Sequence, residues 1–134
     1  MAGIGTRNTA PEVLLRKALF RKGFRYRLHD RALPGRPDIV LPKWRAVVFV
    51  NGCFWHRHPG CRYTTTPATR TEFWASKFDS NVQRDVRNRE ALARLGWRVA
   101  TIWECGTRND VEAVCCTLEI WLRSRETYTL DLPD

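Results

Sequence analysis

The sequence predicts an α/β fold in which a central mixed β-sheet is flanked by helices. Short apolar strand-like runs alternate with longer helical segments, and the run at 47–50 is continuously apolar. The predicted order is one helix, three strands, a loop, a helix, a strand and a helix. The 134 residues have the length of one domain, so we expect a single domain over 1–134.

The first predicted helix spans about residues 9–22. Thr9 is a typical N-cap, Pro11 is tolerated in the first turn, and Glu12 lies three residues after Thr9, as in a capping box. Gly23 ends the helix. Its predicted apolar stripe consists of Val13, Leu14, Ala18 and Leu19.

Three short strands follow this helix. Residues 24–28 alternate between apolar and basic, which is typical of a half-exposed strand. The turn residues at 33–37 separate it from strands at 38–41 and 46–50. The last of these is continuously apolar over 47–50, so we expect it at the centre of the sheet.

The second half of the chain alternates between helix and strand. A loop rich in Cys, His, Pro and Gly spans about 51–69, and a long helix follows at 71–95 with Gly96 at its C-terminal end. A buried strand is predicted at 97–104 and a last helix at 110–123.

The charge balance indicates the kind of partner. The chain has 23 Lys and Arg against 14 Asp and Glu, a formal net charge of +9, and nineteen of the basic residues are Arg. Arg binds phosphates bidentately and stacks on bases, so we expect a nucleic-acid partner, although a generic basic surface has the same composition. No apolar run could span a membrane and no secretory signal is found, so we expect a cytoplasmic protein without membrane contact.

The first candidate site is the carboxylate of Asp38, which enters a strand after a Gly-Arg-Pro turn. A carboxylate between two short strands is a suitable ligand for a hard cation such as Mg²⁺. A turn-capping role explains the same residue, and the dipeptide alone favours that role.

The second candidate site is a group of cysteines and histidines. Zn²⁺ takes four N or S ligands in a tetrahedron, so three thiolates and one imidazole would complete a site. The other imidazole would then be free for acid–base chemistry. Cys115 and Cys116, on the last predicted helix without a nearby His, are expected to be buried thiols. The candidate ligands are Cys53, His56, His58, Cys61 and Cys105.

A third group is aromatic. Phe54 and Trp55 lie in the predicted loop, outside any strand, and large apolar side chains on a basic surface can wedge into a base stack. Trp74 lies on a stripe with four-residue spacing on the long helix, a pattern that favours the helix core. That stripe consists of Trp74, Phe78, Val82 and Val86.

A series of motifs in a fixed order connects these candidates. The motifs are Thr6–Glu12, Leu33–Asp38, Asn51–His56, Pro67–Trp74, Lys77, Asn81, Arg84–Asp85, Leu95–Val99 and Trp103–Cys105. Together they resemble the very-short-patch-repair (Vsr) mismatch endonuclease family over essentially the whole chain. The resemblance implies a restriction-endonuclease-like core and a single endonuclease domain over 1–134.

The resemblance also implies catalytic roles. The known member of the family nicks DNA immediately 5′ of the thymine in a T:G mismatch left by deamination of 5-methylcytosine. Asp38 and the backbone carbonyl of Val50 match the ligands of a catalytic Mg²⁺. His56 matches a histidine proposed to activate the attacking water, and Glu12 matches an acid near the site.

Structural and DNA-contacting roles follow from the same resemblance. The matching ligands of a structural Zn²⁺ are Cys53, His58, Cys61 and Cys105. The matching intercalating aromatics are Phe54, Trp55 and Trp74, which for Trp74 replaces the core interpretation. Further DNA contacts are expected from Arg36, Lys77 and Asn81.

The sequence departs from the family pattern in three places. Asn51, which we keep as a catalytic candidate, stands where the best-known relative has a second active-site histidine. An amide can hydrogen-bond a water molecule but cannot accept its proton, so a two-histidine mechanism does not transfer to this chain. The Cys53–Cys61 loop is one residue longer, and alignment assigns His58 rather than His56 to zinc. We also expect weaker DNA binding, because an N-terminal arm of the family has no counterpart here.

These features predict a Mg²⁺-dependent mismatch nicking endonuclease with a structural Zn²⁺. Two alternatives stay open: a nuclease of the same fold with another mismatch or sequence specificity, and a zinc-stabilised DNA-binding module with weak catalysis. The expected partners are mismatched duplex DNA, mismatch-repair proteins and a repair polymerase. We expect a monomer in the bacterial cytoplasm that associates with the nucleoid when bound to DNA.

Overall fold

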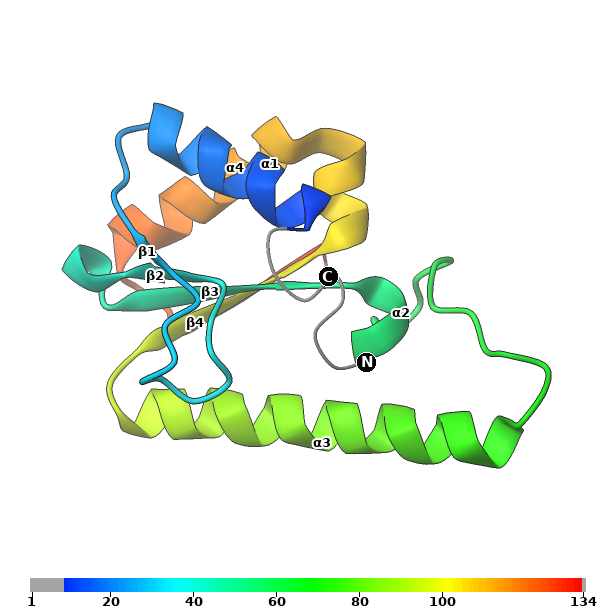
Figure 1. Cartoon of the computed structure of the whole chain (residues 1–134). Coiled ribbons are helices and arrows are strands. Elements are labelled where there is room, and N and C mark those ends of the chain that lie inside the picture. Colours follow the sequence, from blue (N-terminus) through cyan, green and yellow to red (C-terminus); the bar gives the residue numbers. More distant parts are fainter. Residues whose placement is uncertain (1–8, 134) are drawn as a thin grey trace.

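A computed structural model describes residues 9–133, so the first three residues of the Thr6–Glu12 motif lie outside the described part of the chain. One five-stranded sheet is covered by helices on both faces (Figure 1). The helices are α1 (Ala10–Arg21), α2 (Cys53–His56), α3 (Thr71–Arg94), α4 (Glu104–Ser124) and the short 3₁₀ helix η1 (Pro42–Trp44). The strands are β1 (Arg27–Leu28), β2 (Ile39–Leu41), β3 (Ala46–Asn51), β4 (Arg98–Trp103) and β5 (Thr129–Leu132).

The sheet is mixed, as the sequence predicts. Its strands lie in chain order, with β1, β2 and β3 antiparallel and β3, β4 and β5 parallel. Parallel neighbours need long crossover connections, which α3 supplies between β3 and β4 and α4 supplies between β4 and β5. The carboxyl ends of β3 and β4 therefore meet at one edge of the sheet, where Asn51 pairs with Trp103. The short helix α2 follows β3 at this edge (Figure 1).

Alternate strand residues fill a core on each face of the sheet. Ile39, Leu41, Val48 and Ile102 belong to the core under α1 and α4. On the other face Val40, Val47 and Val99 pack against Leu92 of α3. The buried residues of the 24-residue α3 are Phe78 and Leu92 alone, worth roughly 3–6 kcal/mol together, so most of α3 presents its side chains to solvent.

The N-terminal helix has the predicted position and N-cap residue, but the face that it buries differs in part from the predicted one. Thr9 occupies the N-cap position without a side-chain capping bond, so the predicted capping box does not form. Leu15 is fully buried, whereas Leu14, which we expected on the buried stripe, is 46% exposed. Glu12 turns inward and is 1% exposed, so a carboxylate lies on the buried face of α1.

Three further elements differ from prediction. The strand expected at 24–28 is paired only over Arg27–Leu28, because Phe24 is buried in the core before the strand begins. The last helix begins at Glu104, and the expected start at Asp110 is an internal break (φ −162°, ψ 88°). The Asp110 carboxylate accepts a hydrogen bond from the N–H of Ala113 at 3.1 Å and so caps the second segment of the helix. Strand β5 was not predicted.

Within residues 9–133, none of the helices is both long enough and apolar enough to cross a membrane.

Candidate active site and metal centre

Asp38 lies directly before β2, beside the central strand β3. Its Oδ2 accepts a hydrogen bond from the backbone N–H of Val50 at 2.7 Å. Burial raises the pKa of Asp38 to about 7; the Val50 bond lowers it, the Glu12 carboxylate raises it, and His56 lowers it. The carboxyl group therefore ionises with difficulty unless a cation lies beside it.

Glu12 and a histidine that the sequence analysis overlooked complete this group. His29 Nε2 lies 2.7 Å from Glu12 Oε2, and Arg16 Nη1 lies 3.0 Å from the same oxygen. One ligand atom from each of Glu12, His29 and Asp38 can be chosen so that all lie within 4.8 Å of one another. Two carboxylates and an imidazole at this spacing could hold a divalent cation.

The pairing register of the β1–β2 hairpin could have predicted that His29 lies near Asp38. Leu28 pairs with Ile39, so the next residue on β1's side falls opposite Asp38. The His29 N–H donates to the Asp38 carbonyl at 3.2 Å. Counting symmetrically about the turn at 33–34 places these two residues together, a signal that the search for clustered motifs did not use.

His56 is the last residue of α2 and is oriented by α3. Its Nδ1 lies 2.7 Å from Oδ2 of Asp85, a residue in the Arg84–Asp85 motif for which no role was predicted. A carboxylate that holds Nδ1–H leaves Nε2 as the basic nitrogen. Asn51 is buried at the end of β3, one residue after Val50.

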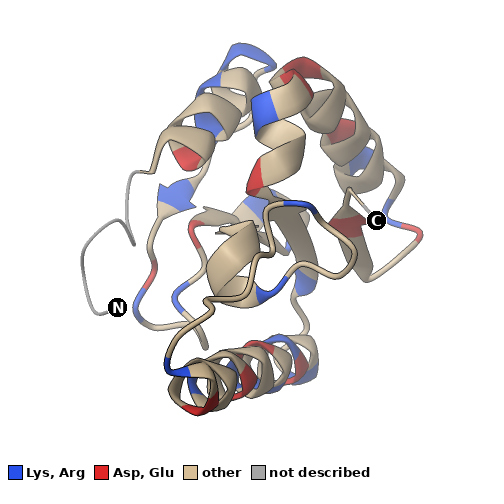
Figure 2. Ribbon diagram, turned by 90° about the vertical axis from the view of Figure 1, so that its right-hand side faces the viewer, with Lys and Arg blue, Asp and Glu red and all other residues tan. Residues whose placement is uncertain are grey.

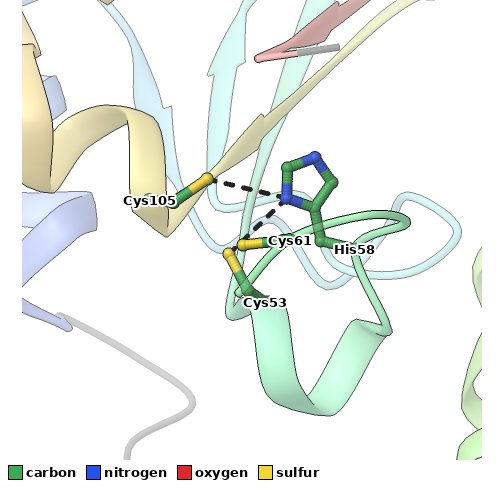
Figure 3. A group of neighbouring side chains, drawn as sticks. All are labelled: Cys53, His58, Cys61 and Cys105. Atoms are coloured by element: carbon green, nitrogen blue, oxygen red, sulfur yellow. Dashed lines mark hydrogen bonds between the residues drawn. The ribbon is translucent and has the colours of Figure 1, made fainter. Parts of the chain in front are cut away.

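A second group of side chains joins the loop after β3 to the start of α4. The four side chains Cys53, His58, Cys61 and Cys105 converge (Figure 3). His58 Nδ1 lies 3.8 Å from Cys53 Sγ and 3.6 Å from Cys105 Sγ. Ligand bonds of about 2.0–2.1 Å to N and 2.3 Å to S place N and S about 3.6 Å apart in a tetrahedron, so the spacing fits a four-coordinate ion.

The surroundings of His58 fix which nitrogen is free. Nε2 lies 3.1 Å from the carbonyl oxygen of Pro133, so Nε2 carries the proton and the Nδ1 lone pair faces the thiols. The ring stacks on Trp103, with centroids 4.4 Å apart and planes 11° from parallel. Pro133 directly follows β5, so the unpredicted strand contributes to this centre.

The thiols of this group differ in acidity. Burial raises the pKa of Cys53 and of Cys105. Burial also acts on Cys61, but hydrogen bonds from the backbone of Tyr63, from His58 and from the other two thiols lower its pKa to about 7. One thiolate is thus accessible near neutral pH, and a bound cation would favour ionisation of the other two.

The two cysteines outside this group do not behave alike. Cys115 is buried, as predicted, whereas Cys116 is exposed, contrary to prediction. Successive helix residues point about 100° apart, so both side chains cannot face the same core.

Four aromatic side chains, Phe54, Trp55, Trp74 and Phe78, form an aromatic cluster between α2 and α3. Their ring centroids are 4.9 to 6.4 Å apart. Phe78 is buried and the other three are half-buried, while Val82 and Val86 are 37% and 39% exposed. The predicted helix-core stripe is therefore wrong beyond Phe78, and Trp74 belongs to the cluster instead. Phe54 and Trp55 lie on a helical turn rather than in a loop.

Besides the three aromatic side chains, three residues were predicted to contact DNA, and two of these, Lys77 and Asn81, lie on one surface of α3. Asn81 Nδ2 donates to the Trp55 carbonyl at 3.3 Å, and Arg84 Nη2 donates to Asn81 Oδ1 at 3.1 Å. Arg36 is exposed on the connection between β1 and β2, outside this surface. An open hollow on α3 is lined by Phe73, Ser76, Lys77, Ser80, Asn81 and Arg84.

Comparison with known proteins identifies the family. The family model "DNA mismatch endonuclease Vsr" matches residues 1–62. The DNA mismatch endonuclease Vsr of Escherichia coli is 46% identical over 126 residues, which cover 91% of this chain and 80% of that protein. The type II nicking enzymes V.NmeAIP of Neisseria meningitidis and V.XorIIP of Xanthomonas oryzae are 44% and 49% identical, over 86% and 78% of this chain and 80% and 76% of their own lengths. The chain belongs to the Vsr family of DNA mismatch endonucleases.

Proposed function

We propose that this protein is a divalent-cation-dependent endonuclease that nicks one strand of duplex DNA immediately 5′ of the thymine in a T:G mismatch. One observation carries the proposal: the single turn of α2 carries both His56, which is near enough to Asp38 to favour its charged form, and the Phe54 and Trp55 side chains of the aromatic cluster. Cutting and mismatch-sensing groups thus share one rigid element. The relatives named as a mismatch endonuclease and as nicking enzymes support the same activity.

The Asp38 group would hold a catalytic Mg²⁺, with Asp38, Glu12 and the carbonyl of Val50 as its protein ligands. When bound, the ion neutralises charge that develops on the phosphate and on the leaving 3′ oxygen. His56 accepts the proton of the attacking water at Nε2, while Asp85 holds its Nδ1–H. Asn51 hydrogen-bonds the same water or the phosphate, because its amide cannot serve as a base.

The aromatic cluster would supply the mismatch preference. Half-buried rings of Phe54, Trp55 and Trp74 can insert into a base stack, and unstacking a step costs a few kcal/mol. A wobble pair is opened more cheaply than a matched pair, so insertion favours mismatched sites. The basic and amide groups of Lys77, Asn81 and Arg36 would then position the backbone.

The second group of side chains would hold a structural Zn²⁺ through Cys53, His58, Cys61 and Cys105. A four-residue helix such as α2 is not stable alone, so it needs an external anchor. Cys53 is its first residue and His56 its last, so a closed tetrahedral site fixes both the proposed base and the aromatic side chains between them.

The wider setting is proposed on the same basis. The protein would act as a single domain and a monomer on DNA in the bacterial cytoplasm, associated with the nucleoid. Mismatch-repair proteins and a repair polymerase would process the nick. Lys and Arg are spread over helices and connecting segments (Figure 2), which suits a protein that contacts a phosphate backbone.

Two substitutions separate cleavage from mismatch recognition. Asp38→Ala should abolish nicking of a T:G duplex yet leave its binding within about twofold, because Asp38 holds the cation rather than DNA. Phe54→Ala should retain nicking but reduce the preference for mismatched over matched duplex by roughly tenfold, the equivalent of about 1.4 kcal/mol. Asp79→Ala and Phe20→Ala, at exposed positions outside both groups, are the matched controls.

The assays are a denaturing gel for nicking and fluorescence anisotropy for binding. Normal nicking by Asp38→Ala would refute the proposed active site. Wild-type binding without cutting of any duplex would instead support a DNA-binding module, and cutting at another mismatch would replace the proposed substrate.

A further inference from the structure

His29 occupies an unusual position next to the proposed cation site. Its side chain is 14% exposed, and its backbone lies in the left-handed region at φ 50°. The backbone N–H donates to the Asp38 carbonyl, which holds the residue opposite Asp38 across the hairpin. The imidazole is therefore carried to the carboxylates of Glu12 and Asp38 by strand pairing.

The Nε2 atom of His29 has no hydrogen-bond partner among the described residues although it is buried. It lies 2.7 Å from Glu12 Oε2, but the two atoms do not meet in hydrogen-bond geometry. A buried ring nitrogen without a hydrogen bond destabilises the folded protein, at a cost in free energy. A ligand that this nitrogen could bind would remove that cost.

The ligand atoms of His29, Glu12 and Asp38 are close enough to share one ion. All three lie within 4.8 Å of one another. In an octahedral site with bonds of about 2.1 Å, neighbouring ligand atoms are roughly 3 Å apart and opposite ones roughly 4.2 Å apart. The 2.7 Å contact between His29 and Glu12 corresponds to neighbouring ligands after a slight separation.

From this geometry we propose that His29 Nε2 is a third side-chain ligand of the cation held by Asp38 and Glu12. The inference rests on the proposed function, because it concerns the same cation. An imidazole is a poor ligand for Mg²⁺ but a good one for transition-metal ions, so the mixed nitrogen and oxygen site prefers Mn²⁺ to Mg²⁺. His29 thereby sets which divalent cation the enzyme uses.

The test uses the full chain with its Cys/His site loaded with Zn²⁺, and Mn²⁺ alone as the probe. Pulsed electron paramagnetic resonance detects the coupling of bound Mn²⁺ to a coordinated ¹⁴N nucleus. We expect this coupling in the wild type, its loss in His29→Asn, and its retention in His56→Gln. Asn tolerates the left-handed backbone at this position, so the variant keeps the hairpin.

Affinity gives a second readout. His29→Asn should weaken Mn²⁺ binding by at least about tenfold, because losing even a residue that only supports a metal ligand typically weakens binding by that much. Mg²⁺ binding, measured by competition with Mn²⁺, should weaken by no more than about threefold, because imidazole is a poor ligand for Mg²⁺. The wild-type ¹⁴N coupling is measured without any variant, so a folding defect in His29→Asn leaves the proposal testable.

The outcomes separate this proposal from the proposed function. In one outcome, Asp38→Ala abolishes Mn²⁺ binding, but the bound Mn²⁺ shows no ¹⁴N coupling, or its coupling survives in His29→Asn. That result overturns the role of His29 and leaves the proposed endonuclease activity unaffected. Mn²⁺ binding that Asp38→Ala does not change overturns both the cation site and the role of His29.

Discussion

At Asp38 the chain places a carboxyl group where burial opposes its charge. The raised pKa, about 7 against an ordinary 3.8, means that the folded protein binds the Asp38 proton more tightly than the unfolded chain does. Stability from this residue is therefore fully present below about pH 4 and is lost as pH rises to about 7. The carboxylate proposed to be catalytic is therefore maintained at the expense of folding stability, unless a cation is bound beside it.

Asp38→Asn removes this charge and should stabilise the protein in buffer without Mg²⁺ or Mn²⁺. The advantage over the wild type should grow between pH 5 and pH 8 by on the order of 2 kcal/mol, because only the wild type must ionise a buried group. Urea unfolding at the two pH values measures it. Added Mn²⁺ should stabilise the wild type and not Asp38→Asn. If the difference in free energy of unfolding between the two proteins did not change with pH, the Asp38 carboxyl group would not be the buried group that ionises.

The contact between His56 and Asp85 carries a second prediction at this scale. Asp85→Asn should reduce the kcat for nicking on the order of a hundredfold with little change in KM, because an amide can hold the imidazole in the wrong tautomer. Asp79→Asn is a matched control on the same helix, since the exposed Asp79 carboxylate accepts a hydrogen bond from Gln83, one turn along α3. Single-turnover nicking kinetics test both variants. Equal losses in Asp85→Asn and Asp79→Asn would show a general effect on α3 rather than a positioning role.

The sequence predicted the candidate site residues that belong to short motifs, but it did not predict which other residues contact them. Asp38, Glu12 and His56 were found because each belongs to a recognisable run of sequence. His29 and Asp85 contact residues 17 and 29 positions away in the sequence, so only the fold shows these contacts.

Among the elements, α2 depends most on its surroundings. It has four residues, begins at Cys53, and packs against α3 through the aromatic cluster. Arg57, directly after it, stacks on Phe78 at 4.0 Å and donates to the carbonyl of Thr65 at 2.8 Å. These contacts and the proposed zinc site together give a helix of one turn a fixed orientation.

Cys61→Ser should remove one proposed zinc ligand and lower both metal content and stability. We expect loss of most bound zinc and a decrease in Tm on the order of 10 °C, because the ion's binding free energy stabilises the loop only in the folded state. Cys116→Ser, at an exposed position outside the group, is the control. Elemental analysis and thermal unfolding give the two readouts, and unchanged zinc content in Cys61→Ser would contradict the assignment.

The order of strands and helices could largely be predicted, whereas their ends and one strand could not. Hydrophobic periodicity predicted β3, β4 and α3 because each has a strong apolar pattern or a clear stop such as Gly96, which adopts φ 88°. The residues of β5 are alternately exposed and half-buried, so its sequence has no strong apolar pattern. It forms a strand because it pairs with β4, a contact that the local sequence does not reveal. The early start of α4 places Cys105 and Glu104 on a helical turn, which tertiary contacts support rather than local propensity.

At the scale of the whole molecule, the sheet brings distant segments to one edge. The hairpin, the end of β3, α2 and the start of α4 meet there, so both candidate metal groups lie beside the same strand ends. α3 runs along one face of the sheet (Figure 1), and most of its side chains are exposed or half-buried. With a formal net charge of +9, the molecule is attracted to DNA before any base is recognised, and in the proposed mechanism the aromatic cluster and the Asp38 group then determine where it cuts.

The central claim, cation-dependent nicking at a mismatch, is tested most directly with end-labelled duplexes on a denaturing gel. The substrates carry a T:G mismatch, another mismatch or only matched pairs, each with and without Mg²⁺. The account predicts one Mg²⁺-dependent cut immediately 5′ of the mismatched thymine, with the opposite strand intact. Equal cutting of matched and mismatched duplexes, or no cutting of any duplex that the protein binds, would contradict it.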